Sequence, residues 1–351
     1  MGLALVSLEN VRCIESAELE LDPACSLIWG SNGSGKTSIL EALHLLGRGR
    51  SFRTRNSERV IRRGADRLLV VGRLVEPETT LGIQVARGVP TVARAGGHPV
   101  GALAELSTHF PVQVIDPSLH KLIEEGGAWR RRWMDWAVFH VEPGFLTAWT
   151  RYQRALRQRN AALRTLPAEA SAWDSELTRS GEVLDDARRR SIERLQPYWA
   201  EVTRTLVGRE VSMTYSRGWA TDRTLAEALA EARPKDQGRL TTQVGPHRAD
   251  IQVRIDGVAA RDAASRGQQK LIAAAMILAQ IKLVRGVLIT APTLLLDDPA
   301  AELDRGRLGA FIDQVAELRC QLILTALAPD PGLFGVPGRR FHVEQGRVRP
   351  V

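Results

Sequence analysis

The chain has 351 residues, of which 44% are hydrophobic and 25% charged, as in a soluble globular protein of one or two domains. Its longest nearly unbroken apolar run, Leu271–Ile281, is too short to cross a bilayer, so no membrane partner is expected, and three cysteines without metal-ligand spacing predict thiols in a reducing cytoplasm. The net charge of +8 favours an acidic partner such as nucleic acid, although a genomic bias towards arginine explains part of it, since only five of the basic residues are lysines.

The first third of the chain has the pattern of a strand-rich domain. Short apolar segments recur and end at turn-forming residues. One segment differs, because its apolar residues recur at helical spacing, which predicts a helix over Ser38–Leu46. The predicted strands are Leu3–Val11, Glu18–Leu21, Ser26–Trp29, Leu68–Val75, Leu81–Val85 and Val112–Ile115.

Residues 117–207 change to long, charged and amphipathic helix. Two predicted helices, Gly144–Leu166 and Ser171–Val207, flank a break at Pro167. Large apolar side chains recur along the second helix at helical spacing, so we expect a helical hairpin that uses this stripe as its core.

Strands and helices alternate after residue 207. The predicted strands are Val211–Tyr215, Leu240–Val244, Ile251–Ile255, Thr293–Leu296, Gln321–Thr325 and Phe341–Val348, and the predicted helices are Gln268–Val284 and Asp304–Leu318. This alternation predicts an α/β fold with a largely parallel sheet covered on both faces. The sheet must then be built from both ends of the sequence. We therefore expect a split domain of residues 1–116 and 208–351, interrupted by a helical lobe of residues 117–207.

The strongest functional pattern is a phosphate loop, Gly30-Ser31-Asn32-Gly33-Ser34-Gly35-Lys36-Thr37, between a predicted strand and a predicted helix. Its glycines let consecutive N–H groups converge on phosphate oxygens, and the N-terminus of the following helix adds to the attraction. Lys36 would reach the β- and γ-phosphates of ATP, and Thr37 would offer its hydroxyl to Mg²⁺.

Two carboxylates complete the expected ATP site. Asp297 and Asp298 follow the apolar strand Thr293–Leu296, at the strand edge where ligands bind in open α/β sheets. Asp297 would hold Mg²⁺, and Asp298 would polarise the attacking water. The three cysteines lack metal-ligand spacing and are expected to be buried thiols: Cys13, Cys25 and Cys320.

A second group of phosphate-binding donors lies at the start of an apolar helix. Its residues are Ser265, Arg266, Gly267 and Gln268. A helix N-terminus attracts anions, so these donors could cover the side of ATP that the phosphate loop leaves open. If they cannot fold back onto the loop of their own chain, they must serve a second copy. Two chains related by a twofold axis would then bury two ATP molecules between them.

These segments together resemble the ABC-type ATPases of DNA maintenance and, in order and detail, the RecF recombination-mediator family. The resemblance spans essentially the whole chain. It is carried by the phosphate loop, by Ser265-Arg-Gly-Gln-Gln-Lys270 (the signature segment), and by Asp297-Asp298 with Ala301-Glu-Leu-Asp304. Further matches are Gly47-Arg-Gly-Arg-Ser-Phe-Arg53, Arg130-Arg-Arg-Trp-Met-Asp135, Val138-Phe-His-Val-Glu-Pro143, and Gly245-Pro-His-Arg248 with Asp250.

The resemblance implies an ABC-type ATPase head, in which an antiparallel β-subdomain accompanies the parallel sheet, with the helical lobe inserted. It implies an ATP-dependent homodimer on DNA, with slow, DNA-stimulated hydrolysis that acts as a timer. The family acts at gaps between single- and double-stranded DNA, in repair, replication and SOS induction. It works with RecR and RecO, and indirectly with RecA, which it helps to load.

The sequence departs from the family pattern at several positions. Ala264 replaces a leucine, and Pro299-Ala300-Ala301 replaces a bulkier stretch that ends in serine. Thr325-Ala326-Leu327 stands where many ABC ATPases have a histidine, and Asp298 is shorter than the glutamate of transporters. These differences indicate a timer rather than a fast motor.

Two single residues are weaker candidates. Gln113 is either the glutamine that senses Mg²⁺ and the attacking water in ABC folds or a simple strand residue, and it is kept as a catalytic candidate with Asp298 and Lys36. Arg12, in the turn after the first strand, is a candidate nucleotide contact.

The candidate DNA surface is the basic segment, residues 48–67, which holds eight arginines against two acids. Contacts to DNA phosphates require positive charge in quantity rather than one spacing, and no base-reading module is evident. A solvated surface, or partial use for nucleotide, remains an alternative. The DNA-contacting candidates are Arg48, Arg50, Arg53, Arg55, Arg59, Arg62 and Arg63.

Three alternative functions remain open. Another SMC-like DNA-maintenance ATPase would share every motif. A transporter-type ABC subunit would couple to a membrane partner. The arginine-rich surface, the helical insertion and the missing histidine argue against this alternative. A small-molecule kinase would leave the signature segment unexplained.

Overall fold

The computed structural model describes residues 2–289, 291–302, 305–329, 335 and 337–351. The chain divides into two compact units. The first joins both ends of the sequence, Met1–Leu119 and Leu288–Val351, and the second is the continuous segment His120–Val287.

The first unit contains a six-stranded sheet in the order β15-β14-β3-β13-β12-β8. All neighbours in it run parallel except β15, which pairs antiparallel with β14. Its strands are β3 (Cys25–Trp29), β8 (Val112–Ile115), β12 (Thr293–Leu296), β13 (Leu322–Ala326), β14 (Arg339–Glu344) and β15 (Arg347–Pro350). Strands from both ends of the sequence therefore share one sheet, which confirms the predicted α/β fold with a mostly parallel sheet.

A second, antiparallel sheet lies in the same unit, in the order β2-β1-β4-β5-β6-β7. Buried residues alternate with more exposed ones along its central strands, as expected for a sheet with one face on the core. The strands are β1 (Leu3–Val11), β2 (Ile14–Glu20), β4 (Arg67–Leu74), β5 (Thr79–Ala86), β6 (Val92–Ala95) and β7 (His98–Pro99). The antiparallel subdomain that the family resemblance implied is therefore present.

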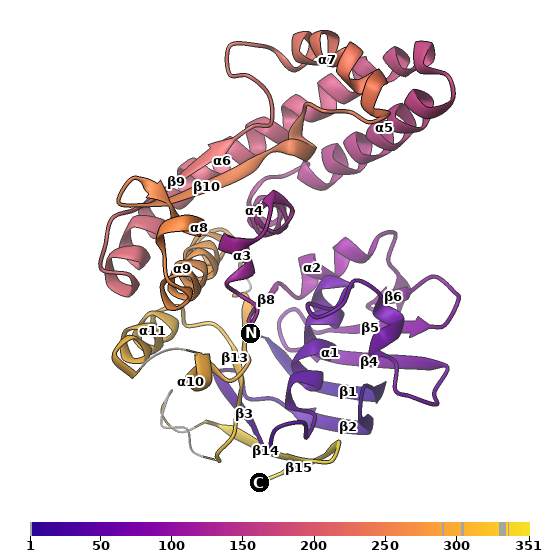
Figure 1. The fold of residues 1–351 in the computed structure, drawn as a ribbon. Helices are drawn as coiled ribbons and strands as arrows, with labels where there is room; N and C mark the ends of the chain where they lie inside the picture. Colours follow the sequence, from indigo (N-terminus) through magenta and orange to yellow (C-terminus); the bar gives the residue numbers. More distant parts are fainter. Residues whose placement is uncertain (1, 290, 303–304, 330–334, 336) are drawn as a thin grey trace. The chain divides into compact units, whose positions relative to one another are not determined.

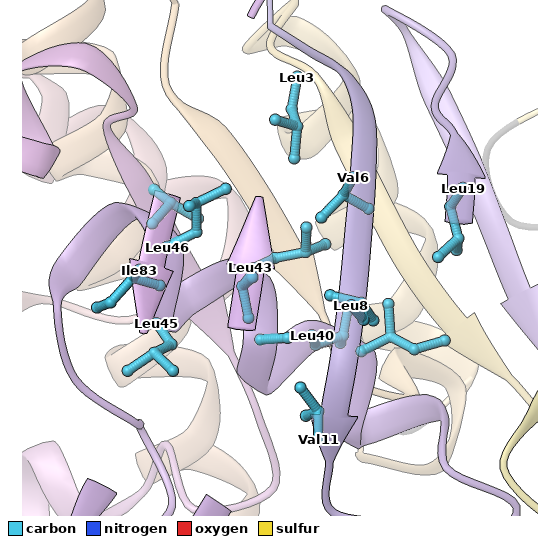
Figure 2. Close-up of a cluster of buried hydrophobic side chains, with 14 of the residues drawn as sticks. Leu3, Val6, Leu8, Val11, Leu19, Leu40, Leu43, Leu45, Leu46 and Ile83 are labelled. Carbon is cyan, nitrogen blue, oxygen red and sulfur yellow. The ribbon is translucent and has the colours of Figure 1, made fainter. Parts of the chain in front are cut away.

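Helix α1 (Lys36–Arg48) packs against both sheets and forms the centre of the core. Figure 2 shows its side chains Leu43 and Leu46 near Leu3, Val6 and Leu8 of β1. Strand residues of the parallel sheet in the same buried cluster are Ile28, Val112, Leu295, Ile323, Phe341 and Val343. Because α1 follows the phosphate loop directly, this core fixes where the loop points.

Short helices complete the first unit. They are α2 (Leu106–His109), α10 (Pro299–Glu302), α11 (Arg305–Glu317) and the 3-10 turns η1 (Ser57–Val60) and η2 (Leu103–Glu105). The predicted helix over Asp304–Leu318 corresponds to α11, although Leu303 and Asp304 lie outside the described residues. The cysteines are free thiols as expected, but none of them is buried, and Cys13 is exposed.

The second unit is built on the predicted helical hairpin. Helix α5 (Phe145–Thr165) packs against α6 (Asp174–Leu206), and Pro167 opens the 3-10 turn η3 (Pro167–Trp173) between them (Figure 1). The other helical elements are α3 (Lys121–Glu124), α4 (Gly127–Val141), α7 (Leu225–Arg239), η4 (Pro246–Arg248), α8 (Ala260–Ala263) and α9 (Arg266–Arg285).

Three short strands accompany these helices, in the order β11-β10-β9. They are β9 (Val211–Ser216), β10 (Asp250–Ile255) and β11 (Val258–Ala259), all antiparallel. Strand β9 and helix α9 both pack on α6. Residues 208–287 therefore group with the helices in one compact unit, whereas the sequence pattern assigned them to the split domain.

The predicted strand over Leu240–Val244 is wrong. Leu240 ends α7 with a left-handed backbone (φ 54°), and the residues after it form no strand. The segment is held by α5 instead, since the side-chain oxygen of Asn160 accepts hydrogen bonds from the N–H and hydroxyl of Thr242. None of the helices in the described part of the chain is long and apolar enough to span a membrane.

Candidate functional site

The phosphate loop connects β3 to α1 through positions that only glycine fits easily. Gly30 has φ 153°, and a Cβ there would lie 2.2 Å from the carbonyl oxygen of Val343. Gly35 has φ 119°, and a Cβ there would lie 2.9 Å from Cys13 Sγ. No side chain caps the start of α1. The first N–H groups of that helix are therefore available to an anion.

Lys36 lies almost fully buried within the loop. Its Nζ donates hydrogen bonds to the carbonyls of Gly30 (2.7 Å) and Ser31 (2.9 Å). Burial lowers the pKa of Lys36, and the nearby Asp298 and Asp297 oppose that shift. The hydroxyl of Ser34 is buried without a hydrogen-bond partner among the described residues. A cradle with a buried cation and an unused hydroxyl fits a polyphosphate.

The two threonines and two aspartates of the site form one connected group. Thr37 Oγ1 lies 3.0 Å from both carboxylate oxygens of Asp297, although 260 residues separate them. Thr325 Oγ1 donates to Asp297 Oδ1 (2.8 Å) and accepts from the N–H of Asp298 (2.9 Å). Thr325, the first residue of the stretch where many ABC ATPases have a histidine, therefore positions both acids. The sequence patterns did not reveal this role.

Strand register explains this grouping. Strands β12 and β13 run parallel with Leu296 opposite Leu324, so the next residues, Asp297 and Thr325, stand level at the end of the sheet. Asp298 then turns away with a left-handed backbone, φ 49°. Such a conformation is uncommon outside glycine and is typically retained where a turn or a functional site requires it.

The loop and the acids line one pocket of about 380 Å³. Its lining residues, all from the first unit, are Cys13, Asn32, Gly33, Gly35, Lys36, Thr37, Ser38, Arg53, Pro117, Asp297 and Asp298. No group of three or more acidic, cysteine or histidine side chains in the described ranges could hold a metal ion unaided. Thr37 and Asp297 nevertheless suit Mg²⁺, because this ion usually takes one or two carboxylates together with phosphate oxygens and water.

Gln113 is not brought to this pocket. It lies buried within β8, opposite Leu294 of β12, three positions before the level of Asp297. The residue level with Asp297 is Asp116, followed by the pocket residue Pro117. The structure therefore favours the strand-residue alternative for Gln113.

Arg12 binds a carboxylate of its own chain. Its guanidinium donates two hydrogen bonds of 2.8 Å to Glu41, which is fully buried on α1, and this bond raises the pKa of Arg12. Ser51 also donates to Glu41. Arg53 lies 3.7 Å from the same carboxylate and lines the pocket. Arg53 is therefore an arginine of this pocket; it belongs to the basic segment, for which the sequence left contact with DNA and partial use for nucleotide both open.

The signature segment caps helix α9 in the second unit. The hydroxyl of Ser265 accepts from the N–H of Gln268 (3.3 Å), and the Gln268 side chain accepts from the N–H of Ser265 (2.9 Å). Arg266 is exposed and lies 3.6 Å from Glu124. A Cβ on Gly267 would meet no atom within 4 Å, so this corner of the helix is open to an approaching group.

The basic segment contains arginines in different environments. Arg48 is half-buried at the end of α1, and desolvation lowers its pKa. Arg62 pairs with Glu15 (3.0 Å). The exposed candidates are Arg50, Arg53, Arg55, Arg59 and Arg63. Exposure suits a surface that meets phosphates.

The motifs around Arg130 and Gly245 are internal to the second unit. Arg130 forms a bidentate pair with Asp250 (2.8 and 2.9 Å), and Arg188 forms one with Asp135 (2.8 and 3.0 Å). His247 is largely buried, accepts or donates at 2.7 Å with Tyr152, and has its pKa lowered to about 4 by burial. These arginines stabilise the lobe and are largely withdrawn from any DNA surface.

Comparison with known proteins agrees with this geometry. The family model for the RecF/RecN/SMC N-terminal domain matches residues 3–331. The chain is 38% identical to the DNA replication and repair protein RecF of Pseudomonas aeruginosa (strain LESB58), over 99% of this chain and 97% of the relative. It is 39% identical to the protein of that name from Xanthomonas axonopodis pv. citri, over 99% and 98%.

Solved structures show the same fold. A structure of the recombination mediator protein RecF with ATP aligns over 100% of this chain and 97% of its own, with a TM-score of 0.89 and 23% identity. An Smc head bound to the C-terminal winged-helix domain of ScpA aligns over 100% and 97%, with a TM-score of 0.60 and 15% identity. The chain therefore has the fold of ABC-type ATPase heads of this group.

Proposed function

The chain belongs to the RecF family of DNA replication and repair proteins, within the RecF/RecN/SMC group, and on that premise we propose that it is an ATP-gated, DNA-binding homodimer. The observation that carries the proposal is the contact between Thr37 and Asp297, at 3.0 Å. It unites the start of α1 with the end of β12 beside a phosphate cradle, as binding of Mg²⁺ and ATP requires.

We assign the nucleotide roles to residues of the pocket. The loop N–H groups and Lys36 would hold the phosphates, and Thr37 and Asp297 would hold Mg²⁺. Asp298, fixed through its N–H by Thr325, would orient the attacking water. The chemistry that bound ATP supplies is transfer of its terminal phosphoryl group to water. Arg53 would add positive charge beside the phosphates.

The signature segment supports the dimer in this proposal. Ser265 and the N–H groups that follow it would contact the nucleotide of a second copy, so that each site uses both chains. Hydrolysis then limits the lifetime of the dimer. A weak ATPase suits such a timer, since the site lacks the longer glutamate and the histidine expected of fast ABC ATPases.

The proposed ligand of the dimer is DNA, at gaps between single and double strands in the cytoplasm. The exposed arginines of the basic segment would contact its phosphates. The related RecF structure is described within the RecFOR pathway. We propose the same partners here, RecR and RecO, acting to help load RecA in repair, replication and SOS induction.

The experiment that tests the proposal measures dimerisation and DNA binding together. Sedimentation and DNA titration are performed without nucleotide, with ADP and with a non-hydrolysable ATP analogue. We expect dimers and the tightest DNA binding only with the analogue, because only a triphosphate spans both halves of the site. Equal DNA affinity in all three states would refute ATP gating, and no DNA binding in any state would refute the assigned ligand.

A further inference from the structure

Helix α5 in the second unit has an unusual charge. Its 21 residues include five arginines and no aspartate or glutamate. The neighbouring α6 carries acids and arginines in similar numbers along its length. A solvated helix surface normally mixes both signs, so a helix with one sign only indicates an interaction with an acidic partner.

Three of these arginines share one exposed face. At 100° per residue, Arg154, Arg157 and Arg164 fall within about 80° of one another. All three are exposed. The residues on the opposite side of the helix are buried against the lobe: Tyr152, Ala155, Leu156, Arg159 and Leu163. The arginine face, defined as Arg154, Arg157 and Arg164, therefore points away from the core of the unit.

The arginine face is also electrostatically unsatisfied. None of its three side chains forms a hydrogen bond or ion pair with a residue in the described part of the chain. The remaining α5 arginines behave differently, since Arg151 pairs with Glu176 (2.7 Å) and Arg159 pairs with Asp174 and Asp236 (2.7 Å each). Carboxylates are therefore available in this lobe, but none is placed opposite the arginine face.

We propose that the arginine face is a second contact surface for the phosphodiester backbone of DNA, separate from the basic segment. A rise of about 1.5 Å per residue places Arg154 and Arg157 about 5 Å apart and Arg164 about 10 Å further along. Duplex DNA offers roughly one negative charge per 1.7 Å of its axis, so several phosphates lie within reach of this row. The inference deepens the proposed function and rests on it.

The chemistry of the face distinguishes DNA from other acidic partners. The residues beside the arginines on this face, Thr150, Gln158 and Ala161, are small or polar, and the exposed Trp149 of α5 lies about 60° outside it, so the face itself offers no apolar anchor for a protein partner. A membrane surface would need an apolar face beside the basic one, and the apolar face of α5 is already buried in the lobe. Arginine fits phosphate oxygens well because its planar fork donates two hydrogen bonds at once.

The test compares the full-length wild type with two triple variants that lose the same charge. The first is R154Q/R157Q/R164Q. The matched control is R179Q/R189Q/R223Q, three exposed arginines that each already pair with a carboxylate. Binding to short duplex DNA is measured with a non-hydrolysable ATP analogue over a series of salt concentrations. Circular dichroism and ATP binding verify that both variants fold.

We expect the first variant to bind more weakly and to lose salt dependence. Log K for DNA binding falls with log salt, and each lost phosphate contact makes this negative slope shallower by about 0.9. The slope of the first variant should therefore be shallower than that of the wild type by about 2 to 3. The slope of the control should differ from that of the wild type by no more than about 0.9, the contribution of one phosphate contact. An equal effect of both variants would show that net charge alone is responsible and would overturn the proposal.

A further variant separates this inference from the proposed function. R55Q/R59Q/R63Q removes exposed arginines of the basic segment. If it weakens DNA binding while R154Q/R157Q/R164Q binds like the wild type, the proposed function stands and the arginine face is excluded. If the wild type itself does not bind DNA, both are overturned. A variant that carries all six substitutions is measured as well. If its loss of DNA-binding free energy equals the sum of the losses of R55Q/R59Q/R63Q and R154Q/R157Q/R164Q, two separate surfaces are supported.

Discussion

Thr325 connects the two acids that the proposed hydrolysis requires. Its hydroxyl uses its one proton on Asp297 and accepts the N–H of Asp298, so both acids depend on one side chain. It is fully buried, where a missing partner is costly. The sequence patterns located both acids but not this threonine, because its position depends on the register of β12 with β13 rather than on a local motif.

The variant Thr325→Val should separate ATP binding from hydrolysis. Valine has nearly the same shape but leaves the N–H of Asp298 and one oxygen of Asp297 without this partner. We expect hydrolysis to fall by about 5- to 150-fold, which corresponds to about 1–3 kcal/mol of lost positioning, while ATP affinity changes little. Single-turnover hydrolysis and equilibrium ATP binding measure the two quantities.

Thr293→Val is the matched control for this prediction. Thr293 is also buried in the parallel sheet, and its hydroxyl bonds to Gln321 (3.1 Å) at the other end of β12. Both variants should lose similar stability, but only Thr325→Val should slow hydrolysis. If the two variants hydrolyse ATP equally well, Thr325 has only a structural role.

At the scale of elements, helix α9 is buried along most of its length but exposed to solvent at its N-terminus. Its residues after the first turn are almost all buried, whereas Ser265, Arg266 and Gly267 at its start are largely uncovered. The capping bonds between Ser265 and Gln268 fix the first turn. The helix therefore presents its N–H groups in a rigid form to whatever approaches.

Ser265→Arg should abolish ATP-induced dimerisation without affecting ATP binding. The larger cation would occupy the position where the nucleotide of a second chain is proposed to approach. Ser265→Ala separates bulk from contact, since it removes the hydroxyl and its capping bond at a cost of about 1 kcal/mol but adds no bulk, and it should weaken the dimer less than Ser265→Arg does. Sedimentation with a non-hydrolysable ATP analogue measures dimers. Dimers of normal stability from Ser265→Arg would contradict a shared site.

The elements that the sequence predicted well are those with a strong local pattern. The phosphate loop, α1 and the hairpin of α5 and α6 follow from glycine spacing and helical periodicity. Helix α7 was not predicted, because it is polar and contains Pro234, and the strand predicted just after it is absent. Side chains of α5 hold both segments in place through hydrogen bonds. The pattern of apolar residues within each segment gives no sign of these contacts.

At the scale of the whole molecule, the split first unit explains why the site could be predicted only in part. The sequence located the phosphate loop and the acids, since each has its own motif. For Arg53 it left DNA and nucleotide open, and for Gln113 catalysis and a plain strand position; the structure adds that Arg53 lines the pocket and that Gln113 lies inside a strand. The depth of Gln113 comes from the pairing of β8 with β12, which sets how far its side chain lies from the sheet edge.

The central claim is that one ATP site needs two chains, and mixing two inactive variants tests it most directly. Lys36→Met removes the phosphate-loop lysine, and Ser265→Arg blocks the signature segment. In a mixed dimer, one site would combine the intact loop of one chain with the intact signature segment of the other. Such mixed dimers would restore about a quarter of the wild-type sites if the chains paired at random, and up to about a half if neither variant paired with itself.

ATP turnover with DNA present is measured for each variant alone and for the equimolar mixture. We predict almost no turnover from either variant and about a quarter to a half of the wild-type rate from the mixture. A mixture no more active than its components would contradict the shared site, because the intact loop of one chain and the intact signature segment of the other would then fail to form a working site.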